Sequence, residues 1–289
     1  MDAVAVDAAA AGAARGGRGT HQNLPAVARK ALSPAAVQPP LVVCLHGFLG
    51  TGRDWEAVAA ALEGRARCLT PDLPGHGKTP LTPGTQSYAA WAQWLAEWLD
   101  ARGLPAVALV GYSLGGRVAL AFAAAFPQRV RALALISAHP GLTHAAERRA
   151  RQRADQARAA AIRAEGLAAF LEAWYRLPLF GMTTEARRQA LIARRSQQRP
   201  AAMARVIAEM SPGRQPPLWE ALAGLPFPVA YIAGEDDAKY AALAEAIAAR
   251  APRVQRFLIP RAAHMVPLDA PQALADVLAA FLSLPPLRT

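Results

Sequence analysis

The feature that most constrains this fold is a serine lying between an apolar run and an Ala-rich stretch. Ser113 occupies the middle of Gly111-Tyr112-Ser113-Leu114-Gly115-Gly116. Residues 106–111 have the composition of a short buried strand, and residues 117–126 favour a helix. A sharp turn from strand to helix strains its apical residue and brings the flanking segments together, so small neighbours are needed. The glycines two positions to either side of Ser113 supply that clearance, and the pattern predicts Ser113 at the apex of such a turn.

Other apolar runs alternate with helical stretches along the chain. Continuous apolar runs are typical of parallel strands that are buried on both faces. The further predicted strands are residues 41–45, 67–71, 131–137, 228–234 and 254–259. The further predicted helices are residues 54–62, 87–102 and 269–284. We therefore expect an α/β fold with a mostly parallel, doubly wound sheet.

The alternation stops between residues 139 and 224, where only helical stretches remain. Glycines and prolines break this segment, at Gly166, Pro178, Gly181 and Pro200. A helical insertion here would form a lid over the strand ends, where doubly wound sheets bind ligands. The expected organisation is a core from residues 41–138 and 225–289 with a lid from residues 139–224.

Residues 1–40 are rich in Ala, Gly, Pro and Arg without periodicity, and we expect them to be mostly disordered. Asp2 and Asp7 stand where a secretory signal carries positive charge, and no apolar core follows them. A plastid or mitochondrial transit peptide and a start codon placed too far upstream remain alternatives. The expected location is the cytoplasm, with the plastid as the alternative.

The formal net charge of +11 is concentrated in the predicted lid. Between residues 144 and 214 there are fourteen arginines and six acids. Most of these arginines are expected to lie on solvated helix faces. The alternative explanation for the excess positive charge is a small anionic substrate that binds beneath this segment. No basic stripe with interleaved aromatic residues suggests nucleic acid, and no apolar run is long enough to cross a bilayer. Cys44 and Cys68 lie in apolar runs, where we expect buried, reduced side chains and neither a disulfide framework nor a metal cluster.

A candidate catalytic triad follows from the order of three residues along the chain. Ser113 precedes an acid after the strand at 228–234, and His264 follows the last strand, which is the Ser…Asp…His order of α/β-hydrolases. Serine needs an imidazole to take its proton, and the imidazole needs an anion to fix its tautomer. We predict Asp237 as that acid, with Asp236 as the less favoured neighbour.

An oxyanion hole is expected beside the triad. Its donors are the backbone N–H groups of Leu114 and of Phe48, the latter in the loop after the first strand. His76, between two glycines in another loop, is interpreted as a structural residue rather than a catalytic one.

Several segments resemble one enzyme family more closely than hydrolases in general. They are Gly111 to Arg117, His139 to Leu142, Arg151 to Asp155, Trp174-Tyr175 with Pro178 and Phe180, Arg194-Arg195-Ser196, and Gly234 to Tyr240. From about Leu41 to Leu282 the chain resembles the 2-succinyl-6-hydroxy-2,4-cyclohexadiene-1-carboxylate synthases of menaquinone and phylloquinone biosynthesis, which are lyases with the α/β-hydrolase fold.

The resemblance implies elimination of pyruvate from a cyclohexene that carries three carboxylates. It implies that the triad acts as a base, with no acyl-enzyme and no cofactor or metal. The substrate-binding residues it implies are Tyr112, Arg117, Arg151, Trp174 and Arg195. We expect the neighbouring Arg153 and Arg194 to be structural or solvated. The expected partner is a small anionic tricarboxylate substrate, with no nucleic acid or membrane, and the protein is expected to be a monomer or small homo-oligomer.

Two positions depart from the family pattern. Ala263 replaces the usual glycine before the catalytic histidine, and Pro267 replaces a second histidine three residues after it. Both are expected to alter the pocket wall. The strands that the family has before Leu41 are not recognisable in this chain.

Two other functions compete with the lyase. A hydrolase of esters or carbon–carbon bonds would use the same triad, with Ser113 as nucleophile or water-orienter, but a neutral-ester pocket has no use for three buried cations. An inactive, ligand-binding hydrolase fold is the other, and the intact triad argues against it.

Overall fold

The computed structural model describes residues 39–81, 84, 86–181 and 184–283. Within them a six-stranded sheet has the order β2-β1-β3-β4-β5-β6, and all neighbouring strands are parallel. The strands are β1 (Leu41–Leu45), β2 (Arg67–Leu69), β3 (Val107–Tyr112), β4 (Val130–Ile136), β5 (Val229–Gly234) and β6 (Val254–Ile259). The predicted parallel sheet is confirmed, with strand boundaries shifted by at most two residues.

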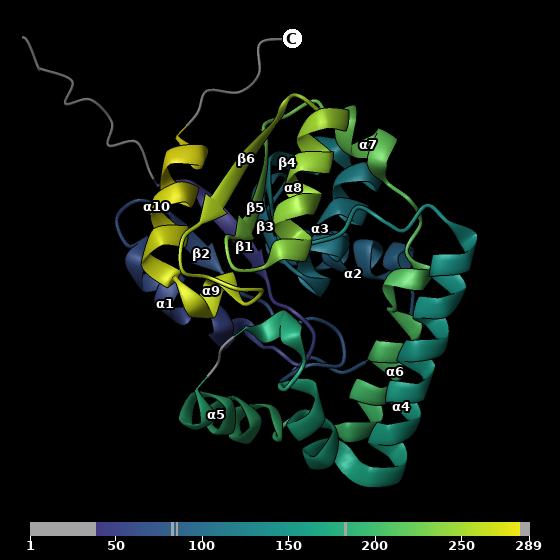
Figure 1. Ribbon diagram of the computed structural model, residues 1–289. Coiled ribbons are helices and arrows are strands. Elements are labelled where there is room, and N and C mark those ends of the chain that lie inside the picture. Colours follow the sequence, from purple (N-terminus) through teal and green to yellow (C-terminus); the bar gives the residue numbers. More distant parts are fainter. Residues whose placement is uncertain (1–38, 82–83, 85, 182–183, 284–289) are drawn as a thin grey trace, which may run out of the picture. The chain divides into compact units, whose positions relative to one another are not determined.

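Helices cover both faces of the sheet, as the doubly wound fold requires (Figure 1). On one face α1 (Glu56–Ala61) packs against α10 (Pro271–Leu282). On the other lie α2 (Tyr88–Asp100), α3 (Leu114–Ala125) and α8 (Ala238–Arg250), with α2 packed on α3. Because all neighbouring strands are parallel, their carboxyl ends lie along one edge of the sheet.

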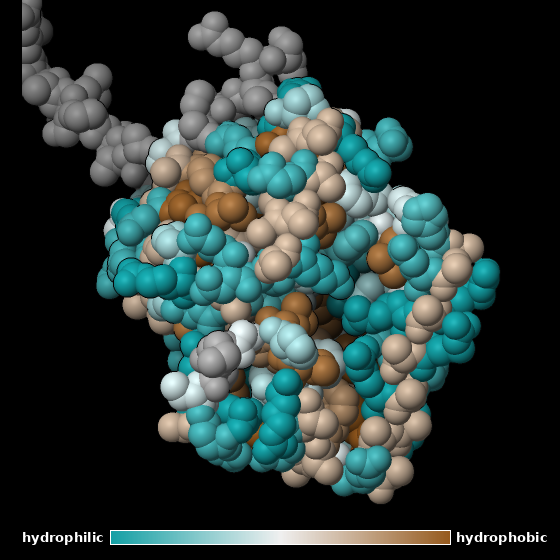
Figure 2. Space-filling model, viewed as in Figure 1, coloured by the Kyte–Doolittle hydropathy of each residue, from teal (hydrophilic) through white to brown (hydrophobic). Residues whose placement is uncertain are grey.

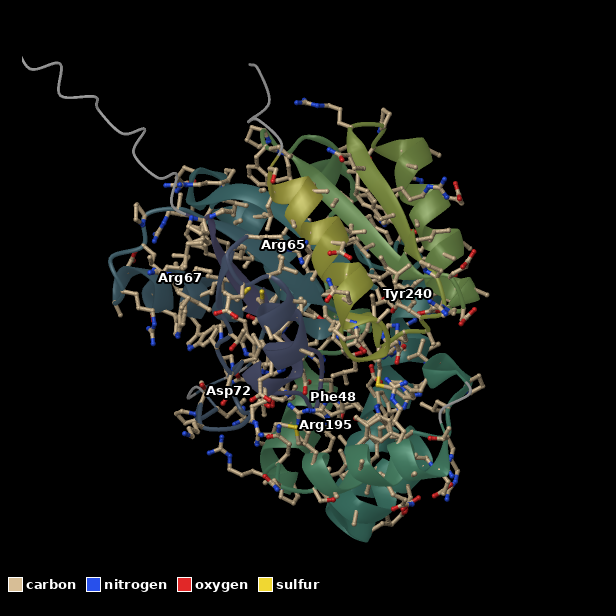
Figure 3. The ribbon with its side chains drawn as sticks, turned by 90° about the vertical axis from the view of Figure 1, so that its left-hand side faces the viewer. Phe48, Arg65, Arg67, Asp72, Arg195 and Tyr240 are labelled. Atoms are coloured by element: carbon tan, nitrogen blue, oxygen red, sulfur yellow. The ribbon has the colours of Figure 1, made fainter. Side chains whose placement is uncertain are left out.

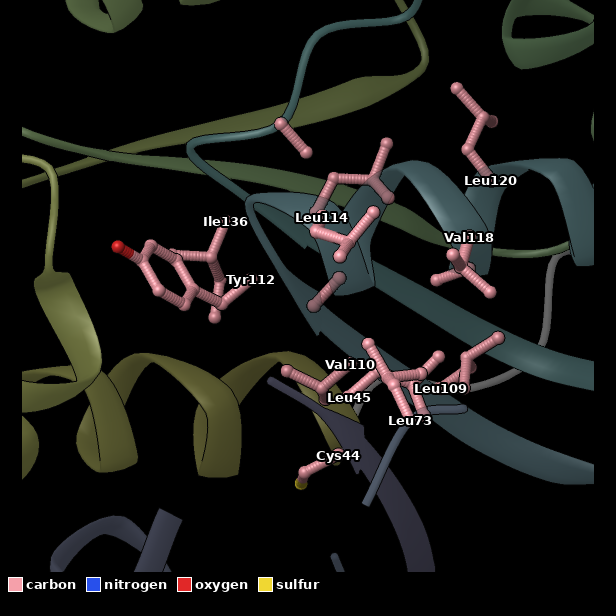
Figure 4. Packing of buried hydrophobic residues seen from close by; sticks show 14 of the residues in the cluster. Cys44, Leu45, Leu73, Leu109, Val110, Tyr112, Leu114, Val118, Leu120 and Ile136 are labelled. Carbon is pink, nitrogen blue, oxygen red and sulfur yellow. The ribbon is translucent and has the colours of Figure 1, made fainter. Parts of the chain in front are cut away.

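The central strands are buried because both of their faces are covered. Every residue of β3 and of β5 is buried. Figure 4 shows Leu45 of β1, Val110 of β3 and Leu114 of α3 in the resulting core. The edge strands are less covered, so Cys68 on β2 is only half-buried, whereas Cys44 on β1 is fully buried. The expected burial of both cysteines is therefore correct for Cys44 alone.

The chain between β4 and β5 is helical, and Figure 1 shows α4, α5 and α6 grouped at one end of the sheet. This segment, the lid, contains α4 (Ala145–Trp174), η3 (Pro178–Phe180), α5 (Glu185–Arg195), α6 (Pro200–Glu209), η4 (Pro212–Arg214) and α7 (Trp219–Ala223). Gly166 interrupts α4 with a φ of 86°, which glycine adopts without strain. Pro178 opens η3 and Pro200 opens α6, as expected of residues that lack an N–H.

The lid is closely packed. α4 packs along α6 and η4, while α7 contacts α3 of the core, and the described residues form one compact unit. The predictions for residues 1–38, including the missing N-terminal strands, lie outside the described residues. Among the described helices, none combines the length and hydropathy that a membrane span needs.

Candidate active site

Ser113 forms the strained turn between β3 and α3. Its φ of 52° and ψ of −108° are conformations that a non-glycine residue rarely adopts. The glycines around it are required by close contact. A Cβ atom on Gly115 would lie 2.3 Å from the Leu45 carbonyl oxygen, and one on Gly111 would lie 2.5 Å from the Gly115 oxygen. The turn therefore aims Ser113 away from the sheet at the carboxyl end of β3.

The three predicted triad residues come together at this end of the sheet. His264 Nε2 lies 3.2 Å from Ser113 Oγ, and His264 Nδ1 lies 2.9 Å from Asp237 Oδ2. The other Asp237 oxygen accepts a hydrogen bond from Tyr240 N at 3.3 Å, which caps α8 and holds the carboxylate in place. Asp236 is exposed, and the imidazole is bonded to Asp237 instead.

The His264 imidazole is buried, and this sets its charge. Burial lowers the pKa of His264 below its usual value, and the hydrogen bond and charge of Asp237 only partly oppose that shift. The neutral ring donates from Nδ1 to Asp237 and leaves Nε2 free to accept the proton of Ser113. The rings of Tyr112 and Tyr240 lie against it, with centroids 5.5 and 4.7 Å away.

The residues of both predicted oxyanion donors line the same cavity as Ser113. Leu114 is the first residue of α3, so its N–H belongs to the helical turn that has no intrahelical acceptors. Phe48 lies in the loop of residues 46–50, which follows β1, and lines the same cavity as Ser113. Leu49, next in this loop, has a φ of 67°, so the loop is held in an uncommon conformation.

Two buried histidines hold the loop of residues 46–50 against the loop of residues 72–77. His46 Nε2 accepts from Leu73 N at 2.9 Å, and His76 Nε2 accepts from Leu49 N at 3.3 Å. Each Nδ1 bonds to a backbone oxygen of its own loop. Burial lowers the pKa of both imidazoles, which keeps them neutral and able to accept. The structural interpretation of His76 is consistent with this bonding.

A lid residue that the sequence did not single out also binds this loop. The buried Gln198 Nε2 donates to Leu49 O at 3.1 Å and to Gly50 O at 2.9 Å. Gln198 Oε1 accepts from Gly77 N at 3.0 Å. One amide therefore links both loops to the lid. Its sequence context, a polar run between two helices, gives no signal of this role.

A cavity opens between the lid and the core. In Figure 2 a recess at this junction has hydrophobic side chains behind a hydrophilic rim. All the predicted site residues except Asp237 line it: Phe48, Tyr112, Ser113, Leu114, Arg117, Arg151, Trp174, Arg195 and His264. Their convergence is the geometry that a small-molecule site needs.

Arg195 is already engaged with a carboxylate of the core. Its Nη1 and Nη2 each donate at 2.8 Å to an oxygen of Asp54, and its Nε donates to Tyr175 Oη at 3.3 Å. The side chain is only 4% exposed, and Figure 3 shows it beside Phe48 where the lid meets the core. Burial opposes its charge, but Tyr175 and Asp54 together raise its pKa. Arg194 pairs with the same Asp54, as expected of a structural neighbour.

The other two predicted arginines have different partners. Arg151 Nε donates to Asp155 at 2.7 Å, and about a third of its side chain is exposed. Arg117 is nearly buried and donates to Tyr88 Oη and, at 3.0 Å, to the Met210 carbonyl. Both partners of Arg117 are uncharged, so its charge is not neutralised by an acid among the described residues, and Arg117 lines the cavity.

The two departures from the family pattern lie outside the cavity lining. Ala263 N donates to Asp269 at 3.0 Å, and Pro267 is buried in the short helix α9 (Val266–Asp269). Neither residue lines the cavity, so the expected change to its wall is not seen. The described residues contain no group of three His, Cys, Asp or Glu side chains placed to hold a metal ion.

Comparison with known proteins places this site in a family. Residues 40–271 match the family described as alpha/beta hydrolase fold. The chain is 37% identical over 245 residues to the 2-succinyl-6-hydroxy-2,4-cyclohexadiene-1-carboxylate synthase of Enterobacter sp. (strain 638), covering 85% of this chain and 92% of that protein.

Solved structures agree with the sequence match. MenH from S. aureus aligns with a TM-score of 0.80 and 29% identity over 86% of this chain and 96% of its own. A thermophilic esterase from Thermogutta terrifontis aligns with a TM-score of 0.71 and 26% identity over 84% of this chain and 89% of its own. Since the sequence match spans most of both proteins, the chain belongs to the 2-succinyl-6-hydroxy-2,4-cyclohexadiene-1-carboxylate synthase family, enzymes with the α/β-hydrolase fold.

Proposed function

We propose that this enzyme eliminates pyruvate from 2-succinyl-5-enolpyruvyl-6-hydroxy-3-cyclohexene-1-carboxylate and forms 2-succinyl-6-hydroxy-2,4-cyclohexadiene-1-carboxylate, a step of menaquinone or phylloquinone biosynthesis. The observation that carries the proposal is a neutral Ser113–His264 pair beside a cavity lined with cations. The name of the Enterobacter relative supports the same reaction.

The positions of the double bonds define the chemistry. The substrate has its ring double bond at C3, whereas the product is a 2,4-diene. A proton must therefore leave C2 while the bond from C5 to the enolpyruvyl oxygen breaks, and the electron pair of the C2–H bond moves through the ring. The released enolpyruvate takes up a proton to become pyruvate. C2 adjoins the ketone of the succinyl group, so negative charge develops on that ketone oxygen.

The triad and the oxyanion donors match these requirements. His264 accepts the Ser113 proton, and Ser113 Oγ removes the proton from C2, so the pair acts as a base without forming an ester. The N–H groups of Phe48 and Leu114 would stabilise the enolate oxygen as its charge develops. Asp237 stabilises the imidazolium that forms.

The cations match the three carboxylates of the substrate. Arg117 has no acidic partner among the described residues, and Arg151 is partly exposed to the cavity. Guanidinium groups bind carboxylates through paired hydrogen bonds, which are stronger than neutral ones. A hydrolase of small carboxylate-bearing esters is the second candidate. The same triad geometry and the structural likeness to the esterase favour it.

Turnover of the enzymatically prepared intermediate tests the proposal. We expect pyruvate, measured with lactate dehydrogenase, to appear in step with the absorbance of the diene. Ser113→Ala and His264→Ala should each lose nearly all of this activity. Ser137→Ala is a matched control, because Ser137 also follows a strand with a positive φ but does not line the cavity.

Two results would count against the lyase. Absence of pyruvate with the purified enzyme contradicts the proposed reaction. A stoichiometric burst of product with an ester trapped on Ser113 indicates nucleophilic catalysis and favours the hydrolase.

A further inference from the structure

The cations that line the cavity differ in whether they are neutralised. Four of them line it: Arg117, Arg151, Arg195 and Lys239. Asp54 and Asp155 are the acidic residues in the same lining. Each of these carboxylates is shared by two arginines, because Asp54 also pairs with Arg194 and Asp155 also pairs with Arg158. The acids of the cavity are therefore fully engaged.

Lys239 has no ion-pair partner among the described residues. It lies in the first turn of α8, two residues after Asp237. Its ammonium lies 5.5 Å from the centre of the Tyr240 ring, which leaves its three donors available. An amphipathic lysine beside an active-site cavity is commonly solvated, so its position relative to the other cations decides its role.

A second cavity adjoins the first at Lys239. The two cavities share Arg151, Trp174, Leu179 and Lys239. The second cavity is open, and its lining also includes Arg158 and two acids, Asp236 and the Asp237 that is bonded to His264. Arg151 and Lys239 thus stand on the lid and on the core at the boundary between the two spaces.

Arg151 and Lys239 both line this boundary, and two like charges there favour a bound anion. Lys239 is exposed to solvent on one side, and partial desolvation and the charge of Arg151 lower its pKa, although Asp237 opposes the shift. Burial, then Lys239, Arg117 and Arg151, lower the pKa of the nearby His139 to about 4. Three cations therefore act on the same region, and a bound carboxylate would relieve their mutual repulsion.

We infer that Lys239, together with Arg151, binds one carboxylate of the substrate at the boundary of the two cavities. This assignment rests on the proposed function and adds a specificity residue that comes from α8 of the core rather than from the lid. Arg195, in contrast, is engaged by Asp54 and contributes chiefly by holding the lid on the core.

The test replaces Lys239 and compares affinity with turnover. Lys239→Gln should raise KM for the intermediate about ten- to a hundredfold, as expected for loss of a charge-assisted contact, and change kcat by less than threefold or so. Lys239→Arg keeps the charge and should stay within about fivefold of wild type. Lys78→Gln removes the same charge from an exposed loop that lines neither cavity, and should leave KM unchanged.

A binding measurement separates this inference from the reaction itself. In the Ser113→Ala background the intermediate should remain unreacted, and calorimetric titration should show the same loss of affinity on adding Lys239→Gln. If wild-type enzyme releases pyruvate but Lys239→Gln keeps its KM and its affinity, the inference fails and the proposed function stands. If Lys239→Arg binds the intermediate as weakly as Lys239→Gln does, the side chain acts through its packing rather than its charge, and the inference fails. If wild-type enzyme releases no pyruvate, the proposed function itself fails.

Discussion

Replacing Gln198 by alanine removes three hydrogen bonds of the lid, two to the loop of residues 46–50 that carries the oxyanion donor Phe48 and one to the loop of residues 72–77. The lost bonds, to Leu49 O, Gly50 O and Gly77 N, have lengths of 3.1, 2.9 and 3.0 Å. At about 1 kcal/mol for each net hydrogen bond, Gln198→Ala should lower the free energy of unfolding by about 3 kcal/mol. Urea denaturation followed by circular dichroism measures this loss.

The same variant should slow turnover more than it weakens binding. Phe48 lies directly before Leu49, so a looser loop misplaces its N–H relative to the developing oxyanion. We expect kcat to fall about ten- to a hundredfold, less than the loss of an oxyanion donor, because the N–H remains but is less well oriented. KM should change by no more than about twofold, since Gln198 does not line the cavity.

Two further variants sharpen this test. Gln198→Glu keeps an oxygen for Gly77 N but places a carboxylate against two carbonyl oxygens, so it should be at least as impaired as alanine. The exposed neighbour Gln197 offers a matched control, and Gln197→Ala should behave as wild type. Wild-type kcat in Gln198→Ala, with a reduced urea midpoint, would show that the amide stabilises the fold without positioning the loop.

The remaining predictions concern charge. Burial lowers the pKa values of His46 and His76, so below about pH 6.5 the unfolded chain binds protons that the folded chain does not. The free energy of unfolding should therefore decline as the pH falls below that value. A urea denaturation curve that is unchanged between pH 8 and pH 5 would contradict this prediction. Arg195→Ala should destabilise the fold by about 3–5 kcal/mol, because it leaves Asp54 buried without its bidentate partner, and a thermal or urea melt measures the loss. Arg117→Ala should lower kcat/KM about ten- to a hundredfold and, through the loss of its two hydrogen bonds, lower the free energy of unfolding by about 2 kcal/mol. Arg205→Ala removes an exposed ion pair with Glu209, so it should change stability by about 0–1 kcal/mol and leave kcat/KM unaffected.

Local sequence was sufficient for the elements that carry the triad. The glycines around Ser113 and the apolar run before it specify a strand-to-helix turn, because close backbone contact allows few other residues there. The order of Ser113, Asp237 and His264 along the chain then predicts that they meet at one edge of a parallel sheet, and their side chains do meet there. The choice between Asp236 and Asp237 depends on which side chain points toward His264, and the sequence alone does not determine that direction.

Contacts between distant segments were beyond prediction. Asp54 is 141 residues from Arg195, and nothing near either residue indicates their pairing. Sequence alone therefore predicted three similar substrate-binding arginines, although one of them is engaged by the core. Gln198 and Lys239 were missed for the same reason, since their roles depend on which loop or cavity the folded chain brings next to them.

The anchoring of the lid has a consequence for how such enzymes diversify. The corner between α5 and α6 is bonded through Arg195 and Gln198 to partners that come from the first third of the chain. A lid exchanged between relatives by recombination would leave Asp54 and the backbone groups of two loops without partners. New substrate ranges in this family are therefore easier to reach by point substitution on the cavity-facing side of α4 than by transfer of the whole lid. Transfer of the lid would also require transfer of Asp54 and its loop.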